Sequence, residues 1–115
     1  MKFQLDEVCS DFEWPVVIKQ PYKGGFKEGV GFTATFAVLD QDEIDKERAA
    51  AGTVDSDIAF CKKILKGWDG VDDKNGKPMA FNKTNLNKVL KVPFIRTAIV
   101  TDYYRAMNGL ARAKN

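Results

Sequence analysis

The clearest pattern along the chain is an alternation of apolar side chains in VGFTATFAV, residues 30–38. Every second residue of this run is apolar: Val30, Phe32, Ala34, Phe36 and Val38. Because successive side chains of a strand point to opposite faces, this pattern predicts a strand with one face on the core. The upstream run WPVVIKQP contains Pro15 and Pro21 and predicts an edge strand. The glycines of YKGGFKEG predict the connection of a hairpin, so residues 16–38 are expected to form an antiparallel pair. KFQLDEV suggests a further strand.

From Asp40 onward the apolar positions follow a helical period. Asp40 with Glu43 three residues later resembles a capping box, and Gly52 stands where a C′ glycine would end a helix over about 41–50. A second helix is expected to begin near residues 55–57. Its apolar stripe consists of Ile58, Cys61, Leu65 and Trp68, with Ile64 beside it. Cys61 is therefore expected to be a small core residue rather than a nucleophile.

Two more helices are predicted after the loop DGVDDKNGKP. The first has Asn82 or Thr84 as its cap and points Leu86, Val89 and Leu90 inward. The second begins at Pro93, since proline is favoured in a first turn, and extends to about residue 112. Its wide apolar face comprises Phe94, Ile95, Ala98, Ile99, Tyr103, Met107 and Leu110.

These elements predict an α+β fold in a single domain over residues 1–115. Residues 1–39 form the β-rich part, an antiparallel β-hairpin or small sheet, and residues 40–115 form a helical part with about four helices. The length of 115 residues and the apolar content of 44% allow a proper hydrophobic core without disulfides or metals.

The cysteines and the apolar runs indicate the compartment. Cys9 and Cys61 are the only two cysteines and lack any metal-ligand spacing, so neither a disulfide framework nor a zinc site is expected. A reducing, cytoplasmic setting follows. No apolar run approaches the roughly 18 residues of a membrane span, and acidic residues interrupt the first residues where a signal peptide needs an apolar stretch. The sequence therefore predicts no membrane association.

The charge is unevenly distributed along the chain. The net charge of +2 divides into −1 over residues 1–39, −4 over 40–76 and +7 over 77–115. Solvated helix faces explain such a distribution, and so does attraction between the acidic middle and the basic C-terminal part of neighbouring copies, or an acidic partner. The sequence leaves these interpretations open.

The segment ILKGWDGVDDKNGKPMAF, residues 64–81, invites a calcium-loop interpretation because of its aspartates. With Gly76 as the obligatory glycine of an EF-hand loop, Val71 falls at position one and Asn82 at position twelve, where carboxylates are needed. Asp-Lys-Asn-Gly is a good β-turn sequence in its own right, because Asn and Gly tolerate positive φ. A turn is predicted, and no metal site.

Catalysis has little support in the sequence. The chain has no histidine, Ser10 and Ser56 lie in no nucleophile motif, and the glycines of GGFKEGVG do not open a helix. We expect no catalytic residue and no cofactor site. A small nucleic-acid-binding protein is an alternative, because eight basic side chains accompany Tyr103 and Tyr104 in residues 77–115. The basic residues are spread over two helices, however, which does not favour nucleic acid as a partner.

The order of these features resembles the tail assembly chaperones of long-tailed bacteriophages over about residues 12–115. The most specific part is a helix ending in Gly67 and Trp68, an acidic turn with Gly76, and Phe81 before a short Asn-capped helix. The segments that carry the resemblance are WPVVIKQP, GFTATFAVLDQDEID, ILKGWDGVDDKNGKPMAFNKTNLNKVL and VPFIRTAIVTDYYRAMNGLARAKN.

The resemblance implies a non-enzymatic, phage- or prophage-encoded protein that acts in the cytoplasm of the bacterial host and is absent from the mature virion. Many copies would form a head-to-tail oligomer, bind the tape measure protein and help to recruit the tail tube protein. Such proteins are often made in two lengths by −1 frameshifting, and Lys114 with Asn115 can be encoded by the slippery run A AAA AAC. Another virion assembly component, such as a connector or a tube accessory, is the main alternative.

Four aromatic residues are the candidate contacts for a partner or for self-assembly: Trp68, Phe81, Tyr103 and Tyr104. Trp68 is expected to be a core anchor or an interface hot spot. Tyr103 and Tyr104 lie about 100° apart on a helix, so they cannot both face the same core. One of them is expected to point outward.

Overall fold

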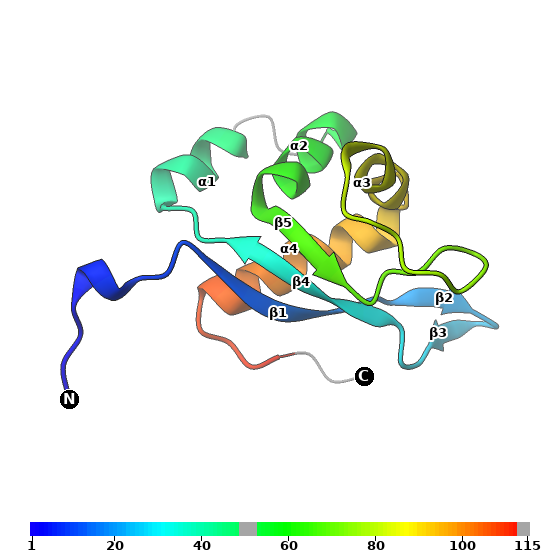
Figure 1. Ribbon diagram of the computed structural model, residues 1–115, viewed down its shortest axis with the longest axis horizontal. Helices are drawn as coiled ribbons and strands as arrows, with labels where there is room; N and C mark the ends of the chain where they lie inside the picture. Colours follow the sequence, from blue (N-terminus) through cyan, green and yellow to red (C-terminus); the bar gives the residue numbers. More distant parts are fainter. Residues whose placement is uncertain (49–52, 113–115) are drawn as a thin grey trace.

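The chain folds into a three-stranded antiparallel sheet with helices packed on one of its faces (Figure 1). This computed structural model describes residues 1–48 and 53–112. The elements in chain order are a 3₁₀ turn Leu5–Glu7, β1 Asp11–Val17, β2 Gln20–Tyr22, β3 Gly25–Lys27, β4 Gly31–Ala37, α1 Gln41–Glu47, α2 Val54–Ile64, β5 Leu65–Asp69, α3 Lys83–Leu90 and α4 Pro93–Met107. The predicted α+β class is confirmed.

The sheet confirms the predicted antiparallel pair. Its strand order is β1-β4-β5, which places β4 in the centre and β1 at an edge, as the prolines of WPVVIKQP indicated. β1 begins at Asp11, earlier than expected. Phe36 pairs with Phe12 and Phe32 with Val16, and these positions point toward the helices. The segment KFQLDEV is not a strand, because only a short 3₁₀ turn forms there and it buries no side chain.

The connection between β1 and β4 is more regular than the sequence suggested. YKGGFKEG was predicted only as the connection of a hairpin, but it contains part of a second hairpin, in which β2 pairs with β3. Lys23 and Gly24 at the tip have φ of 47° and 79°, and two successive positive φ values are the mark of a type I′ turn. The result is a narrow β-ribbon that projects from one end of the molecule (Figure 1).

The second helix is shorter than predicted, and a strand replaces its end. α2 stops at Ile64, and Leu65 and Trp68 belong to β5, which pairs with β4. Leu65 lies opposite Phe36 and Gly67 opposite Thr35, so Lys66 is the extra residue of a β-bulge. The bulge brings Leu65 and Trp68 to the same face of the sheet although their spacing is odd. Because the bulge adds one residue between them, Leu65 and Trp68 have the three-residue spacing that is typical of one face of a helix.

Side-chain hydrogen bonds cap the first turns of α1 and α3. Asp40 and Glu43 form the predicted capping box, in which the Asp40 carboxylate accepts the Glu43 N–H at 2.9 Å. Asn82, rather than Thr84, caps α3 by accepting the Asn85 N–H at 2.9 Å. The predicted stop at Gly52 lies outside the described residues, as do Lys114 and Asn115.

The last helix ends at Met107 and not near residue 112. Gly109 has a φ of 69°, and the N–H groups of Gly109 and Leu110 donate to the carbonyls of Ala106 and Arg105 at 3.2 and 2.8 Å. This pattern is a Schellman motif, for which glycine is favoured because it adopts positive φ without a steric penalty. Leu110 is therefore outside the helix and 56% exposed, so it does not belong to the apolar face.

The core lies between the sheet and the helices. Phe36 from β4, Phe60 and Cys61 from α2, and Ile99 and Tyr103 from α4 are fully buried in it. Cys61 is the core residue that the sequence predicted. Burial raises the pKa of its thiol to about 12, so the reactive thiolate is not formed at neutral pH.

Candidate functional site

The acidic loop after β5 is held by its own side chains. The Asp73 carboxylate accepts the N–H groups of Asn75 and Lys77 at 2.8 and 3.0 Å, and the Asp73 carbonyl accepts the Gly76 N–H at 3.0 Å. Gly76 has a φ of 77°. The predicted β-turn is thus confirmed, and one carboxylate oxygen of Asp73 serves it. No group of three or more potential metal ligands occurs in the described part of the chain.

This loop brings Trp68 and Phe81 together. Their ring centroids are 4.9 Å apart at an interplanar angle of 83°, an edge-to-face contact. The Trp68 indole N–H donates to the carbonyl of Met79 at 2.8 Å, which fixes the ring. Trp68 is half-buried against the core, whereas Phe81 is 37% exposed. The pair therefore presents a rigid aromatic surface beside the loop.

Tyr103 and Tyr104 differ in burial, but both rings pack against Phe60 of the core, so neither side chain points fully outward. Tyr103 is fully buried, and its hydroxyl donates to the Ala37 carbonyl at 2.9 Å and accepts the Leu39 N–H at 3.2 Å. Burial raises the pKa of Tyr103, so the hydroxyl keeps the proton that it donates. Tyr104 is half-buried and stacks on Phe60 with centroids 5.9 Å apart. These two tyrosines and the pair Trp68–Phe81 form separate aromatic groups.

An apolar groove between the β2–β3 ribbon and α4 was not predicted from the sequence. It encloses about 310 Å³. Its apolar lining consists of Val17, Pro21, Phe26, Phe94 and Ala98. Phe26 is 63% exposed although it is a large aromatic residue on a short strand. The available signal was a phenylalanine inside a glycine-rich, polar hairpin, where a core position is not expected.

Asp102 forms the polar floor of this groove and is only 2% exposed. Its carboxylate accepts the Val17 N–H at 2.8 Å, which satisfies a donor on the free edge of β1. The Arg105 Nε lies 3.7 Å from the other carboxylate oxygen and is buried without a hydrogen-bond acceptor in the described part of the chain. Burial raises the pKa of Asp102, while the Val17 N–H, Arg105 and Lys19 act in the opposite direction.

Replacing Asp102 with asparagine should change how stability depends on pH. Because the folded-state pKa of Asp102 is raised, the folded chain keeps this proton at pH values where the unfolded chain, with a pKa of about 4, has lost it. The contribution of Asp102 to stability therefore falls as pH rises from about 4 through the folded-state pKa. The free energy of unfolding of Asp102→Asn minus that of the wild type should rise with pH over this range. Urea denaturation at several pH values measures it, and a flat difference would contradict the assignment.

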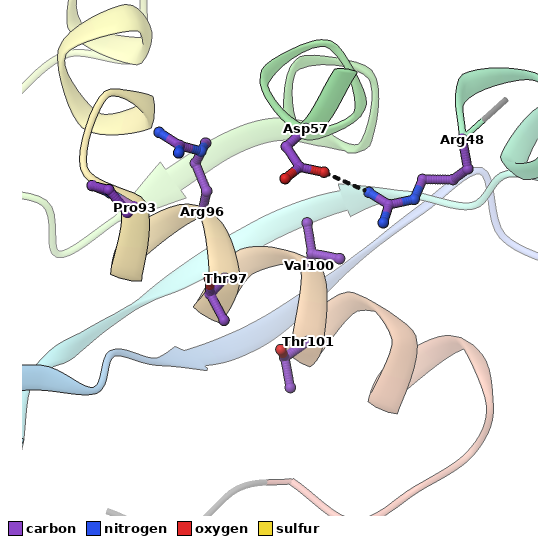
Figure 2. A pocket seen from close by; sticks show the side chains of 7 residues that line it. All are labelled: Arg48, Asp57, Pro93, Arg96, Thr97, Val100 and Thr101. Carbon is purple, nitrogen blue, oxygen red and sulfur yellow. Dashed lines mark hydrogen bonds and ion pairs between the residues drawn. The ribbon is translucent and has the colours of Figure 1, made fainter. Parts of the chain in front are cut away.

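A second depression of about 210 Å³, whose lining is drawn in Figure 2, shares Thr97 and Thr101 of α4 with the groove. Arg48 forms an ion pair with Asp57 at 3.0 Å, and its guanidinium lies 5.1 Å from the centroid of the Phe60 ring. Figure 2 shows Arg96 on the opposite side of Asp57 from Arg48. The Arg96 guanidinium donates to the Leu90 carbonyl at 2.7 Å. Both arginines are therefore engaged in contacts between elements, and we assign this depression a structural role.

Comparison with known proteins identifies the class. The family described as phage tail assembly chaperone matches residues 1–115, the whole chain. No curated protein and no solved structure matches it. Among the described residues, no helix is long and apolar enough to cross a membrane. The chain therefore belongs to the phage tail assembly chaperone family.

Proposed function

We propose that this chaperone oligomerises and binds the tape measure protein during tail morphogenesis. The observation that carries the proposal is the aromatic pair Trp68–Phe81, in which the exposed Phe81 ring contacts the half-buried Trp68. This pair lies apart from the groove beside α4. A long helical protein with apolar faces aggregates unless they are covered, and a chaperone that covers them needs apolar surface of its own. The proposed role has no catalytic step.

Phe81 is the proposed centre of the contact with the tape measure protein. Trp68 supports its ring from the edge, and the hydrogen bond to Met79 holds Trp68 in place. Because the pair is already ordered, little side-chain freedom is lost when a partner binds. Tyr104 is a second proposed contact, since one side of it remains accessible. Tyr103 lies beneath it in the core and would act by supporting Tyr104.

Repetition along a rod-shaped partner requires head-to-tail contacts between copies, because such contacts propagate as rings or open spirals. The acidic residues 40–76 and the basic residues 77–115 would add attraction between neighbouring copies. We propose that the protein acts in the cytoplasm of the bacterial host and helps to recruit the tail tube protein. It would leave the assembly before the virion matures. Mass spectrometry of purified particles tests the last point: retention would favour a connector or tube accessory.

Co-expression with fragments of the tape measure protein tests the function. The wild type should keep a fragment in the soluble fraction, and Phe81→Glu should lose most of this effect because a charge replaces the central apolar contact. Val54→Glu is the matched control, since Val54 is also exposed and apolar but lies at the start of α2. If the wild type does not solubilise any fragment, or if both variants behave alike, the proposal is wrong.

A further inference from the structure

The first nine residues, which we call the N-terminal arm, expose a set of apolar side chains that the fold does not use. Phe3 and Leu5 are 73% and 80% exposed, and Val8 is also exposed. No residue of the 3₁₀ turn in this arm is buried. The Ser10 carbonyl accepts the Val38 N–H at 3.0 Å, so the chain joins the sheet only at the end of the arm.

The arm and the β2–β3 ribbon, which forms one wall of the groove, lie at opposite ends of the molecule. The longest dimension is 47 Å, and Figure 1, drawn with this axis horizontal, shows the arm at one end and the β2–β3 ribbon at the other. An apolar element at one end and an apolar groove toward the other are two different surfaces. When the arm of one copy contacts the groove of another, the interface joins two different surfaces and is heterologous. Repeating this contact from copy to copy gives a ring or an open spiral.

We propose that the N-terminal arm of one copy binds in the groove between the β2–β3 ribbon and α4 of the next copy. Phe3 and Leu5 lie against Phe26 and Phe94, which line the groove. Removal of these apolar side chains from water drives the contact. The inference rests on the proposed self-assembly and names the two surfaces that produce it.

Charge complementarity sets the direction in which the arm lies. Asp6 and Glu7 follow Phe3 and Leu5 in the arm, and Lys19 and Arg105 lie at the groove beside Asp102. The Arg105 side chain is 40% exposed, and its Nε has no hydrogen-bond acceptor among the described residues. The arm therefore places its acidic part at the basic part of the groove and its apolar part near Phe94.

The lengths of the two surfaces agree with this arrangement. Phe94 and Arg105 are eleven positions apart on α4, about 17 Å at 1.5 Å per residue. Phe3 and Glu7 are four positions apart, at most about 14 Å when extended. The arm residues thus fit within the length of the groove.

The arm cannot fill the groove of its own chain. From Ser10 to Val17 the chain runs along β1 for about 24 Å at 3.4 Å per residue. Leu5 is five residues before Ser10 and reaches at most about 17 Å from it. Phe3 could just reach the Val17 end of the groove in its own chain, but Leu5 and the acidic residues after it stay short of Val17. The arrangement described above, with the acidic residues at Lys19, therefore requires the arm of a second copy.

Two full-length variants test the contributions of the arm and of the groove separately. Phe3→Ser/Leu5→Ser alters the arm, and Phe26→Ser alters the groove, while all three replaced side chains are exposed and make no core contact. In sedimentation over a wide range of protein concentration, each variant should associate roughly tenfold or more weakly than the wild type. Tyr22→Ser is the matched control, because Tyr22 is an exposed aromatic residue on the same ribbon outside the groove lining, and it should associate like the wild type.

Mixing the two variants gives the sharpest result. The arm variant keeps an intact groove and the groove variant keeps an intact arm, so an equimolar mixture should form a one-to-one dimer that grows no further. The proposal is overturned if the mixture stays monomeric, if Phe26→Ser associates like the wild type, or if the wild type does not associate. The tape measure assay tests the proposed function separately. If the two variants form a dimer when mixed but the wild type solubilises no tape measure fragment, the arm contact stands and the proposed function is refuted.

Discussion

Tyr103→Ala is expected to lower the free energy of unfolding by about 3–5 kcal/mol, the range for removing a large buried aromatic side chain. Tyr103 contacts the rings of Phe12, Phe36, Phe60 and Tyr104, so its removal leaves a cavity shared by β1, β4, α2 and α4. The same change leaves the Ala37 carbonyl and the Leu39 N–H without their partner. Urea denaturation followed by far-UV circular dichroism measures the effect.

Two further variants divide this effect into its parts. Tyr103→Phe keeps the ring and removes only the hydroxyl, which should cost about 1–3 kcal/mol because two buried backbone groups lose their partner. Tyr104→Ala is the control on the neighbouring position and should cost clearly less than Tyr103→Ala, since Tyr104 is half-buried. Equal losses at Tyr103 and Tyr104 would mean that the buried and half-buried positions are assigned incorrectly.

The sequence predicted the parts of the fold that depend on local chemistry. The alternation of β4, the Asp40–Glu43 capping box and the Asp73 turn were recognisable because each needs only neighbouring residues. β5 was not recognisable, because the bulge at Lys66 is created by pairing with a strand thirty residues earlier in the chain. Tertiary hydrogen bonding determined the structure there, and the helical spacing of Leu65 and Trp68 was misleading.

The candidate site was predictable to the same extent. Trp68 and Phe81 could be expected on either side of a turn, and the structure adds their ring contact and the hydrogen bond to Met79. The groove could not be predicted, because Phe26 and Phe94 come from segments nearly seventy residues apart. An exposed aromatic residue in a polar hairpin becomes informative only once the helix beside it is known.

Trp68→Ala is the second large effect, with an expected loss of about 2–4 kcal/mol, because a half-buried indole leaves the core and Phe81 loses its edge contact. The hydrogen bond from Trp68 to the Met79 carbonyl is lost as well. Far-UV circular dichroism during urea denaturation measures this loss, and co-expression measures binding of the tape measure fragment. Trp68→Ala should impair both stability and solubilisation, whereas Phe81→Ala should impair solubilisation at little cost in stability.

The two tryptophans of the chain form a matched pair for the hydrogen bond itself. The Trp14 indole N–H is buried with no acceptor among residues 1–48 and 53–112, whereas that of Trp68 donates to the Met79 carbonyl at 2.8 Å. Replacing either with phenylalanine removes ring area, but only Trp68→Phe breaks a hydrogen bond and leaves the Met79 carbonyl without its donor. Trp68→Phe should therefore cost about 1 kcal/mol more than Trp14→Phe. If Trp14→Phe proves the more costly, the hydrogen bond to Met79 contributes less to stability than the difference in ring packing between the two sites.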